Sequence, residues 1–300
     1  MNILVTGGRG FIGSRLAREL SAKGHKVTSF DAVEGQSITS RERVQRALNG
    51  IEIVYHLAAE LDESSPTLFE VNVQGTKNIL EEAAKSRVSQ FIYLSSTGVA
   101  GKTTGIVDET FPLKPETRYE ESKAEAEKLV LAYQEALPVT VVRSALVLGP
   151  NKYWHEIIGL VRKEVPLIGN GNNYWQVVYV DDLVSALVFL LGKEESIGEV
   201  FIVAEEKPMK LRELVLLLKK QLGLKQEIKT IPAFVARIAA FAYKLFGKKT
   251  FLSTEHINRL VRERHYSIKK ITAIGWKPAY STEKAVAATV YELEKQEKSS

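Results

Sequence analysis

Residues 2–20 read NILVTGGRGFIGSRLAREL, and this stretch decides the fold. Its apolar, β-branched start is typical of a buried strand, and the residues after Gly13 have the periodicity of a helix. Between them, Gly7, Gly10 and Gly13 permit a tight turn and a close approach to the backbone. Strand, glycine turn and helix in this order predict a site where a pyrophosphate rests on the free N–H groups of the helix.

A second apolar run, 26–30, ends in Asp31, 18 residues after Gly13. A carboxylate at this place can accept hydrogen bonds from both adenosine ribose hydroxyls, which predicts a dinucleotide cofactor. Asp31 favours NAD over NADP because its charge would repel the extra phosphate, and no Arg follows it before Arg41. Arg9 within the turn is the opposing observation, because it is either a solvated loop residue or a ligand of that phosphate.

A third pattern combines Tyr119 and Lys123 with a Ser-Ser-Thr run at 95–97 that closes the strand-like stretch 90–94. Residues four apart share one face of a helix, so the ammonium can lie beside the phenol. A phenol has a pKa of about 10, and a nearby cation together with an oxidised nicotinamide favours the phenolate. Tyr-x-x-x-Lys also occurs on solvated helices, but after a nucleotide signature it predicts hydride transfer. In this reading Tyr119 exchanges the proton and Ser96 bonds the same substrate oxygen.

Composition sets the limits for this interpretation. The 300 residues, 45% hydrophobic and 26% charged, are those of an ordinary soluble protein without a signal peptide or membrane span, expected in the cytoplasm. The absence of cysteine excludes disulfides, thiolate catalysis and cysteine-ligated zinc, and five scattered histidines suggest no metal site. The net charge of +5 is spread among acids, which argues against nucleic-acid binding.

Further strands are predicted at 51–57, 91–95 and 139–143, separated by helices near 66–86 and 117–136. This alternation predicts an α/β fold with a Rossmann-type, doubly wound parallel sheet and right-handed crossovers. After Gly149-Pro150 we expect strands at 177–180 and 200–203, and helices near 210–223, 232–247, 253–264 and 283–296. Residues 1–149 plus 176–204 would then form the dinucleotide-binding domain, and 150–175 plus 205–300 a smaller, mostly helical substrate lobe.

The most apolar of these helices, 232–246, is too short and too interrupted by Arg237 and Lys244 to span a bilayer. We interpret it as lobe core or as a wall of the substrate pocket. Contact with a membrane surface or a partner is the alternative.

The motifs together resemble the extended short-chain dehydrogenase/reductase family, which includes nucleotide-sugar epimerases and dehydratases. The glycine turn is similar to the cofactor loop of that family, and segments 56–59, 72–76, 94–101, 143–150, 178–182 and 274–278 are similar to its later landmarks. Their order covers most of the chain. Counting back five from Gly101, as the family pattern does, selects Ser96 rather than Ser95 or Thr97 as the catalytic serine.

The resemblance implies which residues are catalytic and which contact the cofactor or the substrate. The implied catalytic residues are Ser96, Tyr119 and Lys123. The implied cofactor contacts are Gly7, Gly10, Phe11, Ile12, Gly13, Asp31, Ser37, Ile38, Leu57, Ala58, Ala59, Tyr119 and Lys123. The implied substrate contacts are Thr97, Tyr174 and Trp175.

Four departures from the family pattern bear on this reading. Only five residues separate Asp31 from the segment 37–39, which cannot hold a crossover helix, so we expect a missing or vestigial third strand. Ser37 replaces an adenine-contacting Asp, and Ala100 replaces a Tyr, which opens the pocket. Tyr-Trp-Gln at 174–176 replaces an Arg for the substrate diphosphate, which favours a flatter or less anionic substrate, or a phosphate held by other cations.

The expected function is therefore an NAD(P)-dependent epimerase, dehydratase or dehydrogenase that acts at a secondary alcohol or ketone carbon. A nucleotide sugar is the first choice of substrate, and an apolar steroid-like or flavonol-like compound is the alternative. A non-catalytic NAD(P)-sensing protein is a further alternative, which the intact Ser, Tyr and Lys oppose. By analogy with the family, we expect a homodimer formed through the helices near 66–86 and 117–136.

Overall fold

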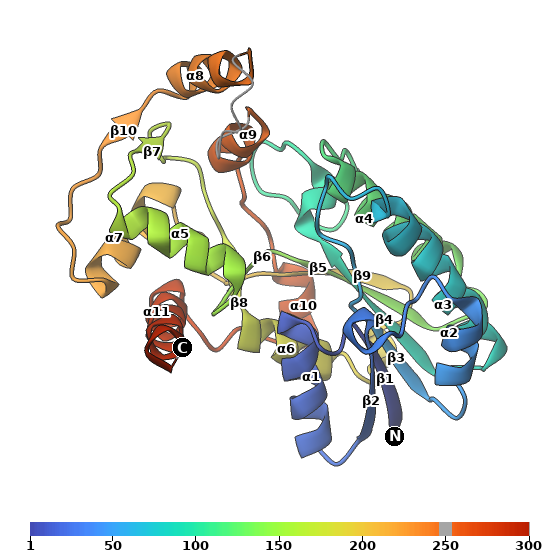
Figure 1. The fold of residues 1–300 in the computed structure, drawn as a ribbon. Coiled ribbons are helices and arrows are strands. Elements are labelled where there is room, and N and C mark those ends of the chain that lie inside the picture. Colours follow the sequence, from blue (N-terminus) through green and yellow to red (C-terminus); the bar gives the residue numbers. More distant parts are fainter. Residues whose placement is uncertain (246–253, 300) are drawn as a thin grey trace.

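The computed structural model of the chain describes residues 1–245 and 254–299. A parallel six-stranded sheet in the order β2-β1-β3-β4-β5-β9 forms its centre (Figure 1). The strands are β1 (Asn2–Thr6), β2 (Lys26–Phe30), β3 (Ile53–His56), β4 (Gln90–Ser96), β5 (Val139–Ser144) and β9 (Glu199–Val203). The fold class predicted from the alternation of strands and helices is thus confirmed.

Both faces of the sheet are covered by helices, which explains the apolar runs in its strands. Ile3 and Val5 of β1 point into one core, whereas Leu4 between them points into the core on the opposite face. The helices of the first core are α1 (Phe11–Ala22), α6 (Val180–Phe189) and α10 (Lys269–Ala273). The helices of the second core are α2 (Arg41–Ala47), α3 (Thr76–Lys85) and α4 (Arg118–Ala132).

The shortened edge of the sheet agrees with the expected loss of the third strand. In the part of the chain that the structure describes, β2 is the last strand on its side. After β2, the chain forms a short 3₁₀ turn, Ala32–Glu34, and then α2, which the sequence analysis missed. The residues between β2 and β3 are enough to form α2, which covers the second core, but too few to form a further strand with its crossover helix.

The helix expected near 66–86 begins differently from the prediction. Residues Glu70–Gly75 form a π-helical turn that leads into α3. Such turns are rare and occur mostly near functional sites. Here the turn carries Asn72, which donates to the carbonyl of Glu60 at 3.0 Å and to the hydroxyl of Ser122 at 2.9 Å.

A second lobe packs beside the sheet, on the left of Figure 1. Its helices are α5 (Lys152–Arg162), α7 (Leu211–Gln221), α8 (Ala233–Leu245), α9 (Thr254–Val261) and α11 (Thr282–Ser299). Two short parallel pairs lie beside these helices: β6 (Leu146–Leu148) with β8 (Val177–Tyr179), and β7 (Leu167–Ile168) with β10 (Thr230–Ile231). Of these four strands only β8 was predicted, as the strand at 177–180. The expected helices 232–247 and 253–264 extend into residues 246–253, which lie outside the described residues.

The two lobes share the segment that follows α9. Tyr266, Ile271 and Trp276 are buried in the core under the sheet, although their neighbours in sequence belong to the second lobe. Among the described residues, no helix is both long enough and apolar enough to cross a bilayer.

Candidate active site

A cleft of about 810 Å³ runs from the glycine turn, across the carboxyl ends of the central strands, to the second lobe. This volume suits a small-molecule site. Fifteen residues named from the sequence line it: Gly7, Gly10, Phe11, Ile12, Gly13, Asp31, Ser37, Ile38, Leu57, Ala58, Ala59, Ser96, Thr97, Tyr119 and Lys123. Tyr174 and Trp175 are absent from the lining.

The glycine turn is packed so closely that side chains are excluded. Gly7 has a φ of +69°, and a Cβ atom there would lie 2.8 Å from the backbone nitrogen of Ala58. A Cβ atom on Gly13 would lie 2.1 Å from the carbonyl oxygen of Gly7. The turn thus brings the start of α1 against β1 and β3. Because no side chain caps the first turn of α1, its N–H groups suit an anion such as a pyrophosphate.

Asp31 lies at the end of β2 in the cleft. Its carboxylate accepts hydrogen bonds from the backbone nitrogens of Arg9, at 2.9 Å, and Val33, at 3.1 Å. The side chain of Arg9 turns to Glu34 instead, with Nε 2.8 Å from Oε1 of that carboxylate. Arg9 is therefore partly neutralised by a neighbour that the sequence analysis did not weigh.

Lys123 and Tyr119 come from the first turns of α4, which begins after Thr117 caps the backbone nitrogen of Glu120. The ammonium of Lys123 is buried, donates to the carbonyl of Leu94 at 2.7 Å and lies 4.2 Å from the centre of the Tyr93 ring. Burial lowers the pKa of Lys123 to about 7, against the attraction of Glu127. The lysine thus contacts strand β4 as well as its own helix.

The pKa of Tyr119 differs from the sequence-based expectation. Burial, followed by the charges of Glu120 and Glu63, raises it to about 12. Without a ligand, desolvation therefore outweighs any help from Lys123, because both groups are less costly in the cleft when they are neutral. A further positive charge is needed to favour the phenolate.

The two neighbouring serines of the Ser-Ser-Thr run are separated by the fold. Ser95 is buried and donates to Oε2 of Glu127 at 2.6 Å. The hydroxyl of Ser96 lies at the end of β4, where it accepts a hydrogen bond from the backbone nitrogen of Gly98 at 3.1 Å. The hydroxyl of Ser96 thus lies in the cleft, where it can form a further hydrogen bond to a ligand. The hydroxyl of Ser95 is used inside the core.

His56, at the end of β3, is a structural residue. Its Nδ1 lies 2.7 Å from the hydroxyl of Thr6, and its Nε2 lies 2.9 Å from that of Thr76. Burial, with a smaller effect of Lys123, lowers the pKa of His56 to about 3. The imidazole therefore stays neutral and joins β1, β3 and α3 behind the glycine turn.

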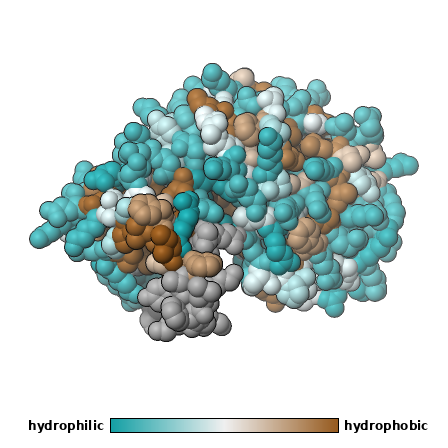
Figure 2. Space-filling model, turned by 90° about the horizontal axis from the view of Figure 1, so that it is seen from above, coloured by the Kyte–Doolittle hydropathy of each residue, from teal (hydrophilic) through white to brown (hydrophobic). Residues whose placement is uncertain are grey.

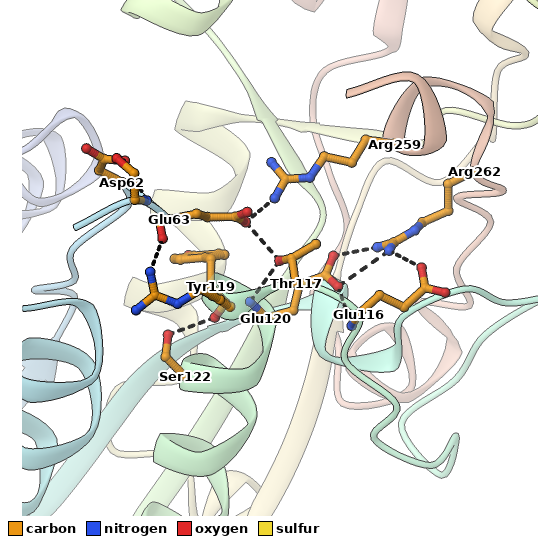
Figure 3. A network of polar contacts seen from close by, with 11 residues as sticks. Asp62, Glu63, Glu116, Thr117, Tyr119, Glu120, Ser122, Arg259 and Arg262 are labelled. Carbon is orange, nitrogen blue, oxygen red and sulfur yellow. Dashed lines mark hydrogen bonds and ion pairs between the residues drawn. The ribbon is translucent and has the colours of Figure 1, made fainter. Parts of the chain in front are cut away.

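The far end of the cleft carries three arginines that the sequence analysis missed: Arg259, Arg262 and Arg264. Figure 3 shows Arg259 reaching Glu63, while Arg262 donates to Glu116 and Glu120. Three arginines within six residues are a visible signal in the sequence. Their position could not be read from it, because it depends on pairing with a distant segment.

That segment is 174–176, and it contains Tyr174 and Trp175, which were predicted as substrate contacts but do not line the cleft. The backbone nitrogen of Arg264 donates to the carbonyl of Tyr174 at 2.9 Å, and that of Gln176 donates to the carbonyl of Arg264 at 3.0 Å. The extended segment presents alternate residues, Arg262, Arg264 and Tyr266, to the cleft. Trp175 is buried beneath, with the Arg264 guanidinium 4.3 Å from its ring centre.

Arg264 differs from its two neighbours in one respect. Its Nη1 is buried and has no hydrogen-bond partner among the described residues. Burial lowers its pKa from the usual value for arginine, but the group remains a strong cation. A buried N–H without a partner is costly, so this group is suited to an anionic ligand in the cleft.

Comparison with known proteins agrees with this geometry. Residues 3–204 match the family described as NAD dependent epimerase/dehydratase. The chain is 26% identical to the solved UDP-glucose 4-epimerase of Thermotoga maritima in complex with UDP-glucose, covering 99% of each chain with a TM-score of 0.81. It is 27% identical to the dTDP-glucose 4,6-dehydratase of Bacillus anthracis in complex with NAD, covering 99% of this chain and 98% of that one, with a TM-score of 0.80. A curated relative from Escherichia coli O157:H7, N-acetyl-alpha-D-glucosaminyl-diphospho-ditrans,octacis-undecaprenol 4-epimerase, is 24% identical over 96% of this chain and 94% of its own.

Proposed function

Because the chain belongs to the NAD dependent epimerase/dehydratase family, we propose that it transfers hydride between NAD and a secondary alcohol or ketone carbon of a nucleotide sugar. The observation that supports this substrate class is Arg264, which lines the same cleft as Tyr119, Lys123 and Ser96 and whose buried Nη1 has no hydrogen-bond partner among the described residues. An anionic group bound to Arg264 would leave the sugar at the end of β4, between the arginine and the cofactor loop.

The dinucleotide would be held by the glycine turn from Gly7 to Gly13, by Asp31 at its ribose, and by Lys123. When bound, the nicotinamide supplies the hydride chemistry. Tyr119 would exchange the proton of the substrate hydroxyl, and Ser96 would orient that oxygen. The positive charge of an oxidised cofactor beside the Lys123 ammonium would offset the burial that raises the pKa of Tyr119 to about 12.

NAD is the proposed cofactor rather than NADP. Asp31 would face the ribose that carries the extra phosphate of NADP, and its charge opposes that phosphate. The one cation in the turn, Arg9, is engaged by Glu34. Both observations support NAD.

A sugar diphosphate is favoured over a steroid-like substrate. The epimerase of Thermotoga maritima was solved with UDP-glucose, and the name of the Escherichia coli relative gives a sugar diphosphate on a polyprenol, so a sugar diphosphate is common to both. An apolar substrate would leave Arg264 desolvated without an anion. The absence of an Arg at 174–176 favoured a less anionic substrate. However, Arg264, which stacks on Trp175, brings a guanidinium group to the same segment.

The test compares the parent enzyme with Tyr119→Phe, with UDP-glucose as substrate and the 4-epimer followed by NMR. We expect turnover to fall about 10²- to 10⁴-fold while NAD affinity stays unchanged. Tyr133→Phe, on a residue outside the cleft lining, is the matched control. Undiminished turnover in Tyr119→Phe would reject proton exchange by Tyr119. If no sugar nucleotide changed the redox state of the bound cofactor, the non-catalytic NAD(P)-sensing alternative would be favoured.

We also propose the domain division given by the sequence: 1–149 plus 176–204 for the cofactor, and 150–175 plus 205–300 for the substrate. A homodimer formed through α3 and α4 and a cytoplasmic location complete the proposal. Sedimentation at micromolar concentration would test the dimer, with a monomer as the contrary result.

A further inference from the structure

Helix α8 has four large apolar side chains on its outer surface between residues 233 and 241. Phe234, Ile238 and Phe241 are 63%, 65% and 62% exposed, and Val235 is 41% exposed. The spacing of four and three residues places the first three on one face of the helix. We call these four residues the α8 apolar face.

The inner side of the same helix is made of small residues. Ala233, Ala236 and Ala240 pack in a cluster with the buried Ile168 and Ile257. A helix on the surface of a soluble protein normally has the opposite arrangement, with large apolar residues inside and polar residues outside. The α8 apolar face therefore contributes little to the packing of the lobe, and contiguous exposed apolar residues of this kind mark contact surfaces.

Figure 2 looks down on this end of the molecule and shows hydrophobic side chains, in brown, gathered on the lower left of its surface. Figure 1 places α8 at the outer end of the second lobe, away from the sheet. Helix α9, which carries Arg259 of the cleft lining, is its neighbour, and Arg237 of α8 donates to the side chain of Asn258 at 3.0 Å. The α8 apolar face is thus an outer surface joined to the arginine end of the cleft.

The sequence around the helix is uniformly basic. Between Glu227 and Glu255 the chain has five of its 41 Lys and Arg residues and none of its 36 Asp and Glu residues. The rest of the chain therefore has 36 of each, so this one segment accounts for the whole net charge of +5. A local excess of this kind attracts an anionic surface and repels a second copy of itself.

We propose that the α8 apolar face binds the surface of an anionic lipid bilayer. Aromatic and aliphatic side chains on one face of a short helix enter the boundary between headgroups and acyl chains, and a basic segment such as 228–254 attracts the headgroups. Bound in this way, the second lobe holds the arginine end of the cleft close to the bilayer. The proposal depends on the exposed residues and the charge, and not on the hydride-transfer chemistry.

The test is co-sedimentation of the full-length protein with vesicles. One set contains equal parts of phosphatidylcholine and phosphatidylglycerol, and the other contains phosphatidylcholine alone. We expect binding to the anionic vesicles, weakened by high salt, and little binding to the neutral ones. The triple variant Phe234→Ser, Ile238→Ser, Phe241→Ser should bind about a hundredfold less, because each lost side chain removes part of the apolar contact.

Tyr291→Ser is the matched control, since Tyr291 is 68% exposed on α11, away from α8. It should bind like the parent. The triple variant replaces only exposed side chains, so its thermal unfolding and its turnover of a soluble sugar nucleotide should match the parent and exclude misfolding. Absence of binding to anionic vesicles, or equal binding by the triple variant, would overturn the proposal. Self-association of the parent that the triple variant abolishes, without vesicle binding, would assign the face to a second copy instead.

Discussion

A methyl group added at Gly13 should separate the cofactor loop from its strand. The Cβ atom of an alanine there would lie 2.1 Å from the carbonyl oxygen of Gly7, and ordinary contact begins near 3.4 Å. The two backbones would have to part by about 1.3 Å, because neither atom belongs to a flexible side chain. Overpacking of this kind costs about 1–3 kcal/mol of folding free energy.

The larger effect should fall on NAD. Displacement of the first turn of α1 moves the N–H groups that would meet the pyrophosphate, and the loss of one charge-assisted hydrogen bond is worth about 1.5–3 kcal/mol. We therefore expect Gly13→Ala to bind NAD at least about tenfold more weakly by calorimetry. Its Tm should fall by about 2–4 °C for each kcal/mol lost.

Gly159→Ala makes the same chemical change where the structure offers open space. Gly159 lies in the middle of α5, and its added Cβ atom would meet nothing within 4 Å. This variant should gain about 0.5–1 kcal/mol of stability and bind NAD like the parent. If Gly13→Ala kept the parent affinity for NAD, the assignment of the pyrophosphate to this turn would be wrong.

Three further variants probe the charges of the cleft. Arg264→Gln should raise KM for a nucleotide sugar at least about tenfold and leave NAD affinity unchanged, and an unchanged KM would place the diphosphate elsewhere. Glu34→Gln releases the side chain of Arg9, so NADP should gain affinity relative to NAD by a few-fold in fluorescence titrations, and no gain would mean that Asp31 alone decides the preference. Burial lowers the pKa of Lys123 from its ordinary 10.5 to about 7, so the unfolded chain holds this proton more tightly. As pH rises from 7 to 10.5, the free energy of unfolding of the parent should therefore increase relative to that of Lys123→Met by up to about 4 kcal/mol in denaturant unfolding. If the unfolding free energies of the two proteins changed in parallel with pH, the pKa of Lys123 would not be lowered.

The features that could be predicted from the sequence are those governed by neighbouring residues. The glycine turn, the strand before it and the helix after it follow from residues 2–20 alone. The loss of the third strand follows from a connection that is too short, and the sheet order agrees. Fifteen predicted site residues line one cleft because the carboxyl ends of parallel strands meet at one edge of the sheet.

The features that could not be predicted depend on residues far apart in the chain. Arg264 reaches the cleft because its segment pairs with 174–176, about ninety residues earlier. Neither segment contains a pattern that predicts this pairing. The same pairing buries Trp175, which in sequence looks like a pocket residue. The raised pKa of Tyr119 has the same origin, since burial is a property of the folded chain.

Arg143 and Arg264 differ in how their guanidinium groups are paired. Arg143 forms a bidentate pair with the buried carboxylate of Glu127, which also accepts the hydroxyl of Ser95. That group joins β5 to β4 and α4. Arg264 has an aromatic ring beneath it, but its Nη1 has no acceptor among the described residues. A desolvated donor without an acceptor costs stability, and an anion bound at Arg264 is the partner that we propose to offset this cost.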